Sequence, residues 1–396
     1  MKKLRVGVWL YGKLNPEMGG VYAYYQELIS VIKNHQFQDA EIIFLNDGIN
    51  YSKDIECKRI LWKPRRMKIL KLFLNFAIKI HPLGKDWRKK LEKQIKKEVE
   101  KLKSEIYQYV DIIYYPGQSC SFPEFPYIYT LWDLAHMSTY AFPELCGDGA
   151  FESRDEYHYL LAHKALMVFV ASETGKKECK KFLNLQEDRI KVVPIFSSGV
   201  IDKKCTAKKP PKLKDDEFFI HYPAQYWAHK NHYNLLAAMP QIIKKFPKIR
   251  LVLTGSDKGN KKYITDTINE LKIQENIIEL GFISSEELRW LYENSQGLVF
   301  PSLLSPISMP LPEAAELGCP VACANLEGRI EQLGEYGYYF NALDANDIAR
   351  QVIAMISDKN VNVPRKYGHK FTIENAVRAI DEAFTEIKNV RFMWDI

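Results

Sequence analysis

The residues with the clearest chemical meaning lie between Ser305 and Gly318, after the apolar run Gly297–Phe300. Prolines delay a regular helix until Pro312, whose fixed φ suits a first helical position. The order strand, tight loop and helix N-terminus directs free N–H groups and a positive dipole end at one point, where an anion can bind. Glu313 is close to that point, and its carboxylate can accept hydroxyl protons from a sugar or ribose. A simple helix cap and turn is the alternative.

A second set of polar residues follows Tyr127–Leu131, an apolar run that predicts a buried strand. Asp133 and His136 come just after it. Ligands of α/β folds bind past the carboxyl ends of parallel strands, so both residues are site candidates. A structural Asp–His pair explains them equally well.

A third candidate is the pair Gly19 and Gly20, between the strand-like run Leu4–Leu10 and the helical pattern Val21–Ile32. Glycines there allow backbone to approach a ligand at a helix N-terminus. The pair matches neither G-x-G-x-x-G nor a Walker loop, and a plain turn is the alternative.

These residues need a framework, and the pattern of strand and helix predicts one. Apolar runs alternate with helical spacing twice along the chain, on both sides of a polar segment at Ser197–Asp216. This predicts an α/β protein with two Rossmann-like, doubly wound domains that face each other across a ligand-binding cleft. We expect an N-terminal domain over 1–205, a C-terminal domain over 206–370, and a helix in 371–396 that packs back on the N-terminal domain.

Length and charge agree with this organisation. The chain has 396 residues, too many for one ordinary core, and a net charge of +7. The basic excess is concentrated in the segment 63–106, where helices are expected over 65–80 and 87–106. Such helices can lie on an anionic membrane or can be solvated helices over a core. No nucleic-acid-binding motif is present, so we expect no nucleic-acid partner.

Two further features concern the cellular location. Seven cysteines occur without C-x-x-C spacing, which is typical of a reducing cytoplasm. No run of about eighteen uncharged apolar residues predicts a transmembrane helix, and the first apolar run is too short for a signal peptide. With the basic segment, these features predict a cytoplasmic protein, peripheral on the inner face of the cell membrane.

Together the motifs resemble family 4 of the retaining, GT-B fold glycosyltransferases, the glycosyl-transferases group 1 of the bacterial surface-polysaccharide type. The family pattern E-G-F-G-L-P-x-x-E-A is similar to Ser305–Ala314, and its G-x-P-V is similar to Gly318–Val321. The loop Pro223–His232 resembles the one that carries the donor-binding lysine. Thr130–His136 with the later Pro-Glu144 resembles the motifs T-x-H-D-L and P-E.

The resemblance implies roles for particular residues. Glu313 would accept bonds from ribose hydroxyls, and Lys230 would neutralise the leaving diphosphate, so no metal ion or other cofactor is expected. The implied catalytic residues are Asp133, His136 and Lys230. The implied donor-binding residues are Gly19, Gly20, Gln225, Lys230, Asn231, Gly255, Phe282, Ile283, Ser305, Pro306, Ile307, Ser308, Met309, Pro310 and Glu313.

The chain departs from the family at three positions. Ser305 replaces a glutamate, Gln225 replaces an arginine, and Trp132 replaces a histidine. The departures are interpreted as altered donor recognition, with lost activity as the alternative.

The resemblance therefore implies a hexosyltransferase. It would move a hexose from GDP-mannose or a UDP-hexose to a growing, lipid-linked polysaccharide such as O-antigen or capsule. Its partners would be the nucleotide sugar, the glycan acceptor and an anionic membrane surface. The alternative is a catalytically impaired GT-B protein that acts as a nucleotide-sugar-binding or partner subunit.

Overall fold

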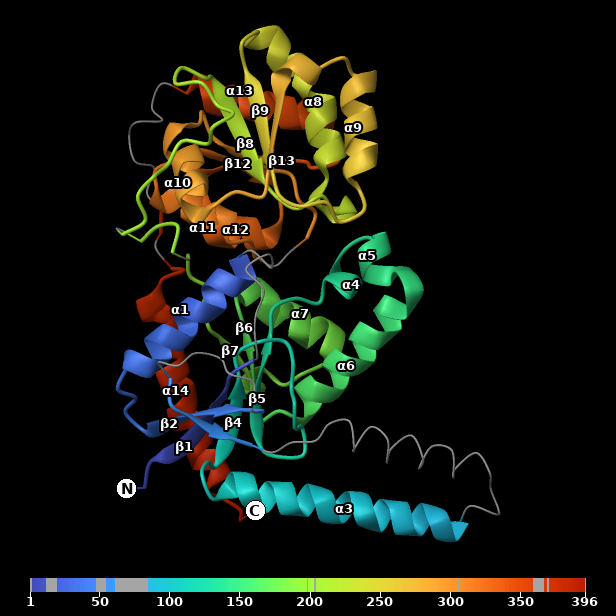
Figure 1. Ribbon diagram of the computed structural model, residues 1–396, viewed down its shortest axis with the longest axis vertical. Coiled ribbons are helices and arrows are strands. Elements are labelled where there is room, and N and C mark those ends of the chain that lie inside the picture. Colours follow the sequence, from blue (N-terminus) through green and yellow to red (C-terminus); the bar gives the residue numbers. More distant parts are fainter. Residues whose placement is uncertain are drawn as a thin grey trace.

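The computed structural model describes residues 2–11, 20–47, 55–60, 85–197, 199–202, 204–304, 307–358, 367–368 and 370–395. In these residues the chain forms two α/β domains placed end to end, and its last helix, α14 (Ile373–Arg391), returns to the first domain (Figure 1).

The N-terminal sheet, as far as the structure describes it, has seven parallel strands in the order β3-β2-β1-β4-β5-β6-β7. Several of its strands are buried on both faces, which explains why they read as continuous apolar runs. The strands are β1 (Leu4–Trp9), β2 (Ala40–Asn46), β3 (Cys57–Arg59), β4 (Ile112–Tyr115), β5 (Tyr127–Leu131), β6 (Met167–Val170) and β7 (Ile190–Val192).

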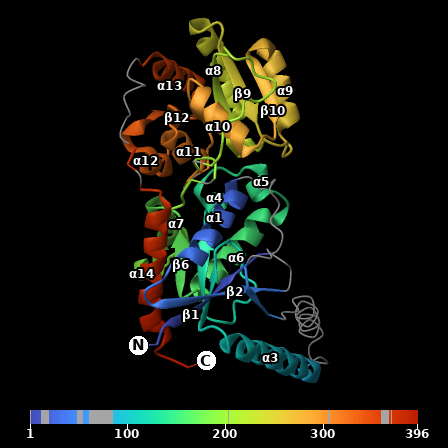
Figure 2. The same ribbon diagram turned by 60° about the vertical axis from the view of Figure 1, so that its left-hand side comes forward.

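Helices cover both faces of this sheet. One face packs against α1 and α14, which lie side by side, and the other packs against α6, α7 and the end of α3 (Figure 2). The N-terminal helices are α1 (Gly20–Asn34), α3 (Lys85–Tyr107), α4 (Ala135–Ser138), α5 (Pro143–Cys146), α6 (Ala150–Lys164) and α7 (Glu173–Leu183), with short 3₁₀ turns η2 (Gly147–Gly149) and η3 (Glu187–Arg189).

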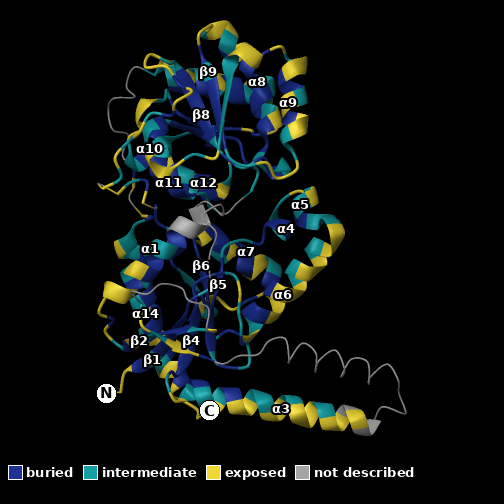
Figure 3. Cartoon of the chain, in the orientation of Figure 1, coloured by how far each residue is buried: buried dark blue, intermediate teal, exposed yellow. Residues whose placement is uncertain are grey.

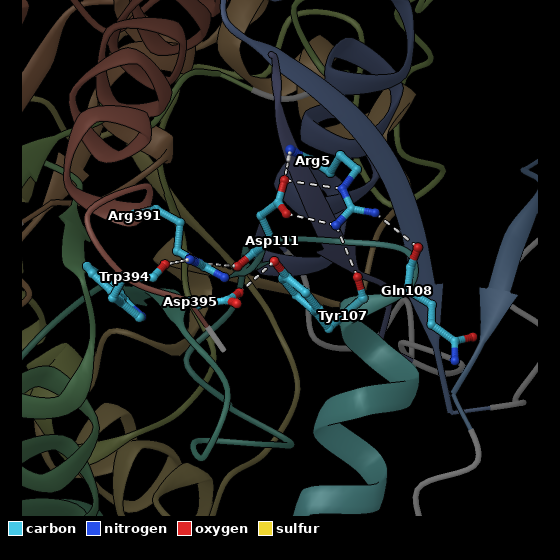
Figure 4. Close-up of polar contacts among 7 residues, drawn as sticks. All are labelled: Arg5, Tyr107, Gln108, Asp111, Arg391, Trp394 and Asp395. Carbon is cyan, nitrogen blue, oxygen red and sulfur yellow. Dashed lines mark hydrogen bonds and ion pairs between the residues drawn. The ribbon is translucent and has the colours of Figure 1, made fainter.

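A buried arginine ties α14 to the N-terminal domain (Figure 4). Arg391 Nε donates to the carbonyl of Asp111 at 2.8 Å, and its Nη1 donates to the carbonyl of Trp394 at 2.9 Å. The Asp111 carboxylate in turn pairs with Arg5 at 2.8 Å. Contacts between residues far apart in the sequence therefore hold α14 against the N-terminal domain.

The C-terminal sheet, within the described residues, has six parallel strands in the order β10-β9-β8-β11-β12-β13. The strand order reverses between β8 and β11, the point at which doubly wound sheets bind ligands. Its strands are β8 (Phe219–Pro223), β9 (Arg250–Thr254), β10 (Ile277–Gly281), β11 (Leu298–Phe300), β12 (Val321–Ala324) and β13 (Gly337–Phe340).

The helices of this domain surround the sheet, and the burial pattern shows buried strands inside exposed outer helix faces (Figure 3). They are α8 (His232–Lys245), α9 (Lys261–Glu270), α10 (Ser285–Asn294), α11 (Pro310–Glu316), α12 (Glu327–Leu333) and α13 (Ala345–Ser357), with 3₁₀ turns η4 (Ala228–Lys230), η5 (Gln274–Asn276) and η6 (Gly334–Tyr336).

Helix α3 projects away from the N-terminal domain (Figure 1). Its last turns bury Leu102 and Ile106, whereas Trp87 near its start is 72% exposed. None of the helices that the structure describes is long and apolar enough to cross a membrane. The helix predicted over 65–80 lies outside the described residues.

Candidate functional site

Helix α11 carries Glu313 into the interior of the C-terminal domain. The helix begins at Pro310, two residues earlier than predicted, because either proline has the φ of a first turn. Glu313 is only 3% exposed, and its Oε2 accepts a hydrogen bond from the Tyr292 hydroxyl at 2.9 Å. Gly318, at φ +72°, follows the helix as expected. The carboxylate is therefore held in one orientation at the end of the β11–α11 loop.

The same loop is held from α12. Arg329 Nη1 donates to Ser308 Oγ at 2.7 Å, and its Nη2 donates to the carbonyl of Leu304. Gln332 accepts from the Ser308 N–H and donates to its carbonyl, at 3.0 Å each. Met309 is buried and packs with the core of the N-terminal domain. The loop is thus fixed at both ends and contacts both domains.

Lys230, at the end of η4, approaches this loop from the other side. Its Nζ lies 5.7 Å from the centroid of the Phe300 ring, and the Arg329 guanidinium carbon lies 5.1 Å from the same centroid. Burial, with a contribution from Arg329, lowers the pKa of Lys230 to about 8. Burial also lowers the pKa of Arg329 to about 10. Both groups remain cationic at neutral pH, and no carboxylate of the described residues forms an ion pair with either one.

Asn231, next to Lys230, joins the segment that carries Lys230 to the start of the β11–α11 loop. Asn231, at φ +58°, donates from Nδ2 to the carbonyls of Pro301 at 3.1 Å and Ala342 at 2.7 Å. The side-chain amide of Asn231 therefore holds the segment with Lys230 against the residues that follow β11 and β13. Gln225 Oε1 accepts from Trp227 Nε1 at 3.1 Å.

The loops that follow β9 and β10 contain an exposed aromatic ring, that of Phe282. Gly255, at φ +118°, follows β9, and a Cβ there would lie 2.8 Å from the backbone nitrogen of Gln225, so only glycine fits. Phe282 follows Gly281 and is 63% exposed, which leaves its ring free to stack on a base. Ile283 is partly buried against a small apolar cluster.

The N-terminal domain contributes the residues after β5. Asp133 Oδ1 accepts from Arg154 Nη2 at 2.8 Å and from the Ala135 N–H at 3.0 Å, at the start of α4. The partner of Asp133 is therefore Arg154, and the Asp–His pair considered from the sequence does not form. His136 is buried, and neither of its ring nitrogens has a hydrogen-bond partner in the described residues. Burial lowers the pKa of His136, so its imidazole is neutral at pH 7.

A carboxylate from the N-terminal domain crosses to the lysine loop. Glu144 of α5 accepts at Oε1 from the backbone N–H of His229 at 3.0 Å and from its Nδ1 at 2.6 Å. Burial lowers the pKa of His229 to about 4. The hydrogen bonds from His229 outweigh the burial of Glu144 and lower the pKa of its carboxyl. The pair is thus a carboxylate and a neutral imidazole, directly beside Lys230.

An open groove of about 510 Å³ lies where the end of α4 meets the carboxyl ends of β12 and β13. Its lining contains Thr139 and Tyr140 from the N-terminal domain and Asn325, Asn341 and Leu343 from the C-terminal domain, and no lining residue is charged. Tyr140 is 58% exposed. The groove offers amide, hydroxyl and ring surfaces to a neutral ligand.

For several of the predicted donor-binding residues the structure gives little or no information on side-chain contacts. Gly19, Ser305 and Pro306 lie outside the described residues. Gly20 is the first residue of α1, at the end of that helix that faces the C-terminal domain (Figure 1). Ile307 and Pro310 are partly buried in the loop.

Comparison with known proteins identifies related chains. Residues 204–371 match the family model for glycosyl transferases group 1. An uncharacterised glycosyltransferase of Methanocaldococcus jannaschii is 26% identical over 183 residues, which are 44% of this chain and 46% of that protein. The O-antigen chain mannosyltransferase B of Escherichia coli is 24% identical over 201 residues, 49% of this chain and 52% of that protein. The chain thus spans about half the length of the curated relatives it matches.

Solved structures extend the likeness to the whole fold. Sucrose-phosphate synthase of Thermosynechococcus elongatus has a TM-score of 0.67 at 16% identity, covering 98% of this chain and 100% of that one. Anabaena HepE in complex with UDP has a TM-score of 0.63 at 16% identity, with the same coverage. The protein therefore has the GT-B fold, and the predicted fold class is confirmed. Its C-terminal domain, over residues 204–371, is similar to the glycosyl transferases group 1 family.

Sequence reasoning missed the residues that support the site from a distance. Tyr292 lies on α10 and Arg329 on α12, and neither residue belongs to a motif that marks a site in the sequence. Glu144 was noticed only as part of a motif, and its partner His229 lies 85 positions away. Arg329 is recognised by its buried charge next to the site, and burial can be seen only in a structure.

Proposed function

We propose that this protein is a retaining hexosyltransferase whose donor is a nucleotide diphosphate sugar. The observation that carries the proposal is the pair of poorly solvated cations, Lys230 and Arg329, beside a loop that leads into buried Glu313. A diphosphate provides the missing negative charge, and a ribose provides hydroxyls for the carboxylate.

In the proposed reaction the acceptor hydroxyl oxygen bonds to the anomeric carbon on the face from which the diphosphate oxygen departs. That departing oxygen takes the acceptor proton, so no protein nucleophile or carboxylate pair is needed. Lys230 stabilises the charge that develops on the leaving diphosphate, and no metal ion or other cofactor is required. Asp133 and His136 lie on the acceptor side.

The donor sugar is proposed from the relatives. One relative is named an O-antigen chain mannosyltransferase, and Anabaena HepE was solved with UDP-glucose. We therefore propose GDP-mannose or a UDP-hexose. The exposed ring of Phe282 is the proposed stacking surface for the base.

The acceptor is proposed to be a growing polysaccharide that occupies the uncharged groove. Amide side chains hydrogen-bond sugar hydroxyls, and an exposed ring such as Tyr140 covers the apolar face of a sugar. Relatives named for O-antigen and capsular polysaccharide synthesis support this proposal.

A lipid-linked acceptor would require the protein to bind the inner face of the membrane, and α3 is the proposed contact. Its sequence has nine basic and five acidic residues, and the helix projects from the domain (Figure 1). Co-sedimentation should show binding to vesicles containing phosphatidylglycerol at low salt and none to neutral vesicles. Equal binding to both, or to neither, would contradict this part.

Transfer assays with GDP-mannose and UDP-hexoses test the enzyme proposal. We expect Lys230→Met and Glu313→Gln to lose transfer and donor hydrolysis, because one removes the charge at the diphosphate and the other removes a charged acceptor. Lys248→Met, an exposed lysine of the same domain, is the matched control. A wild-type protein that binds a donor without transferring or hydrolysing it would be the binding subunit considered above. Full activity in both variants would refute the assignment of the site.

A further inference from the structure

Arg329 is a buried arginine that forms no ion pair with any carboxylate of the described residues. Its side chain is 0% exposed and bonds only to the Ser308 hydroxyl and the Leu304 carbonyl, and its Nε has no hydrogen-bond partner in the described residues. Removing a guanidinium charge from water is strongly unfavourable unless an anion lies nearby. A free protein that keeps such a charge is therefore prepared for an anionic ligand.

A second cation makes this argument stronger. The Lys230 ammonium and the Arg329 guanidinium lie 5.7 Å and 5.1 Å from the same Phe300 ring centroid. Each charge makes burial of the other less favourable, because like charges repel strongly in a poorly solvated place. The carboxylates that also act on Lys230 are those of Asp133 and Glu144, and both already have other hydrogen-bond donors. The arrangement favours a ligand with more than one negative charge.

Arg329 also determines the form of the loop. Leu304 and Ser308 lie on opposite sides of residues 305–306, and the two arms of the guanidinium bond to one of them each. One planar group therefore fixes the separation of the two ends of the loop.

We propose that Arg329 is a positioning residue that makes this site select a diphosphate over a monophosphate. Because it is buried, it does not touch the donor. It holds Leu304 and Ser308 in place, and it adds to Lys230 a second positive charge that uncharged Gln225 does not supply. This inference rests on the proposed function and names the group that sets its selectivity.

Calorimetric binding of nucleoside diphosphates and monophosphates tests the proposal. UDP, UMP, GDP and GMP would be titrated into the full chain, with Arg329→Gln and Arg329→Lys as variants. Arg350→Gln, which removes an exposed arginine of α13 in the same domain, is the matched control. We expect the wild type to prefer the diphosphate of one base. Arg329→Gln should lower that preference about tenfold or more, as expected for one unit charge lost at an effective dielectric constant near 20. Monophosphate affinity should fall less, because a monophosphate carries less negative charge.

Other outcomes would overturn the proposal in distinguishable ways. If Arg329→Gln keeps the wild-type ratio, the role of Arg329 is wrong and the proposed function stands. If this variant is folded and loses both ligands equally, Arg329 is a general structural residue. If the wild type itself shows no preference for either diphosphate, the proposed function fails as well. If Arg329→Gln does not fold, the binding measured with Arg329→Lys tests the role of Arg329. It should keep the preference but bind the diphosphate more weakly, and an unchanged Kd would refute the role of the guanidinium arms.

Discussion

Glu331 of α12 completes the N-terminal cap of α7 in the other domain. Its Oε1 accepts from the Glu173 N–H at 2.7 Å, and its Oε2 accepts from the N–H and hydroxyl of Thr174 at 2.9 and 2.8 Å. The next two N–H groups of α7 bond to the side chain and carbonyl of Ser172. A carboxylate from the C-terminal domain thus satisfies the first orphan donors of an N-terminal helix.

The substitution Glu331→Gln has a magnitude that follows from these contacts. It replaces one acceptor oxygen by an NH₂ group, which costs a charge-assisted hydrogen bond of about 1.5–3 kcal/mol. It also removes a negative charge from the positive end of α7, a loss of about 0.3–1 kcal/mol. Because Glu331 is partly exposed, we take the lower end, about 2 kcal/mol. The amides of Glu173 and Thr174 should then exchange hydrogen about 30-fold faster.

Hydrogen–deuterium exchange of the N-terminal peptide of α7 measures this effect. Glu335→Gln is the control, because this exposed residue of η6 changes the same charge four positions away and is not bonded to α7. Unchanged exchange in Glu331→Gln would refute the reasoning, and so would equal acceleration in the control.

Three further predictions concern the cleft. The kcat/KM for the donor should fall as pH rises through about 8, because Lys230 loses its proton there. Burial and then Arg329 lower the pKa of Lys230, whereas Asp133 and Glu144 raise it. A flat pH profile would exclude Lys230 as the titrating group. Glu144→Gln should move this alkaline limb to lower pH and Arg329→Gln should move it to higher pH, since one removes a negative and the other a positive neighbour; pH profiles of the two variants that shift together would contradict the assignment. Tyr140→Ala should raise the KM for the glycan acceptor about fivefold and leave the donor Kd unchanged, as steady-state kinetics and calorimetry can show.

The elements that the sequence predicts best are the buried parallel strands. The run Leu4–Leu10 predicts β1 within one residue, because a strand covered on both faces is mostly apolar, with Arg5 as the exception here. The sequence of helix α13 also indicates a helix, since its apolar residues recur with helical spacing. Helix α6 was not predicted. It buries His158, Leu161 and Ala162 and otherwise carries mostly polar residues, so no apolar stripe marks it.

The site could be predicted only where its residues are close in the sequence. Lys230 and Glu313 belong to local motifs. The structure places Lys230 near Phe300, where the β11–α11 loop begins, and Glu313 in the helix that follows this loop. The supporting contacts join distant segments, as in the bonds from His229 to Glu144 and from Arg329 to Leu304. Such pairs depend on which segments meet in the folded chain, and no local periodicity encodes that.

The return of α14 to the first domain has a consequence for synthesis. Ala376, Ile380 and Phe384 of α14 belong to the core under the N-terminal sheet, whose last strand ends at Val192. About 180 residues separate that strand from α14, and at roughly 5–20 residues per second a ribosome needs about 10–35 s to make them. Throughout that interval the face of the first sheet that packs against α1 and α14 lacks α14, and by its end every described strand of the second domain has been made. The domain that is made first is therefore the one that is completed last.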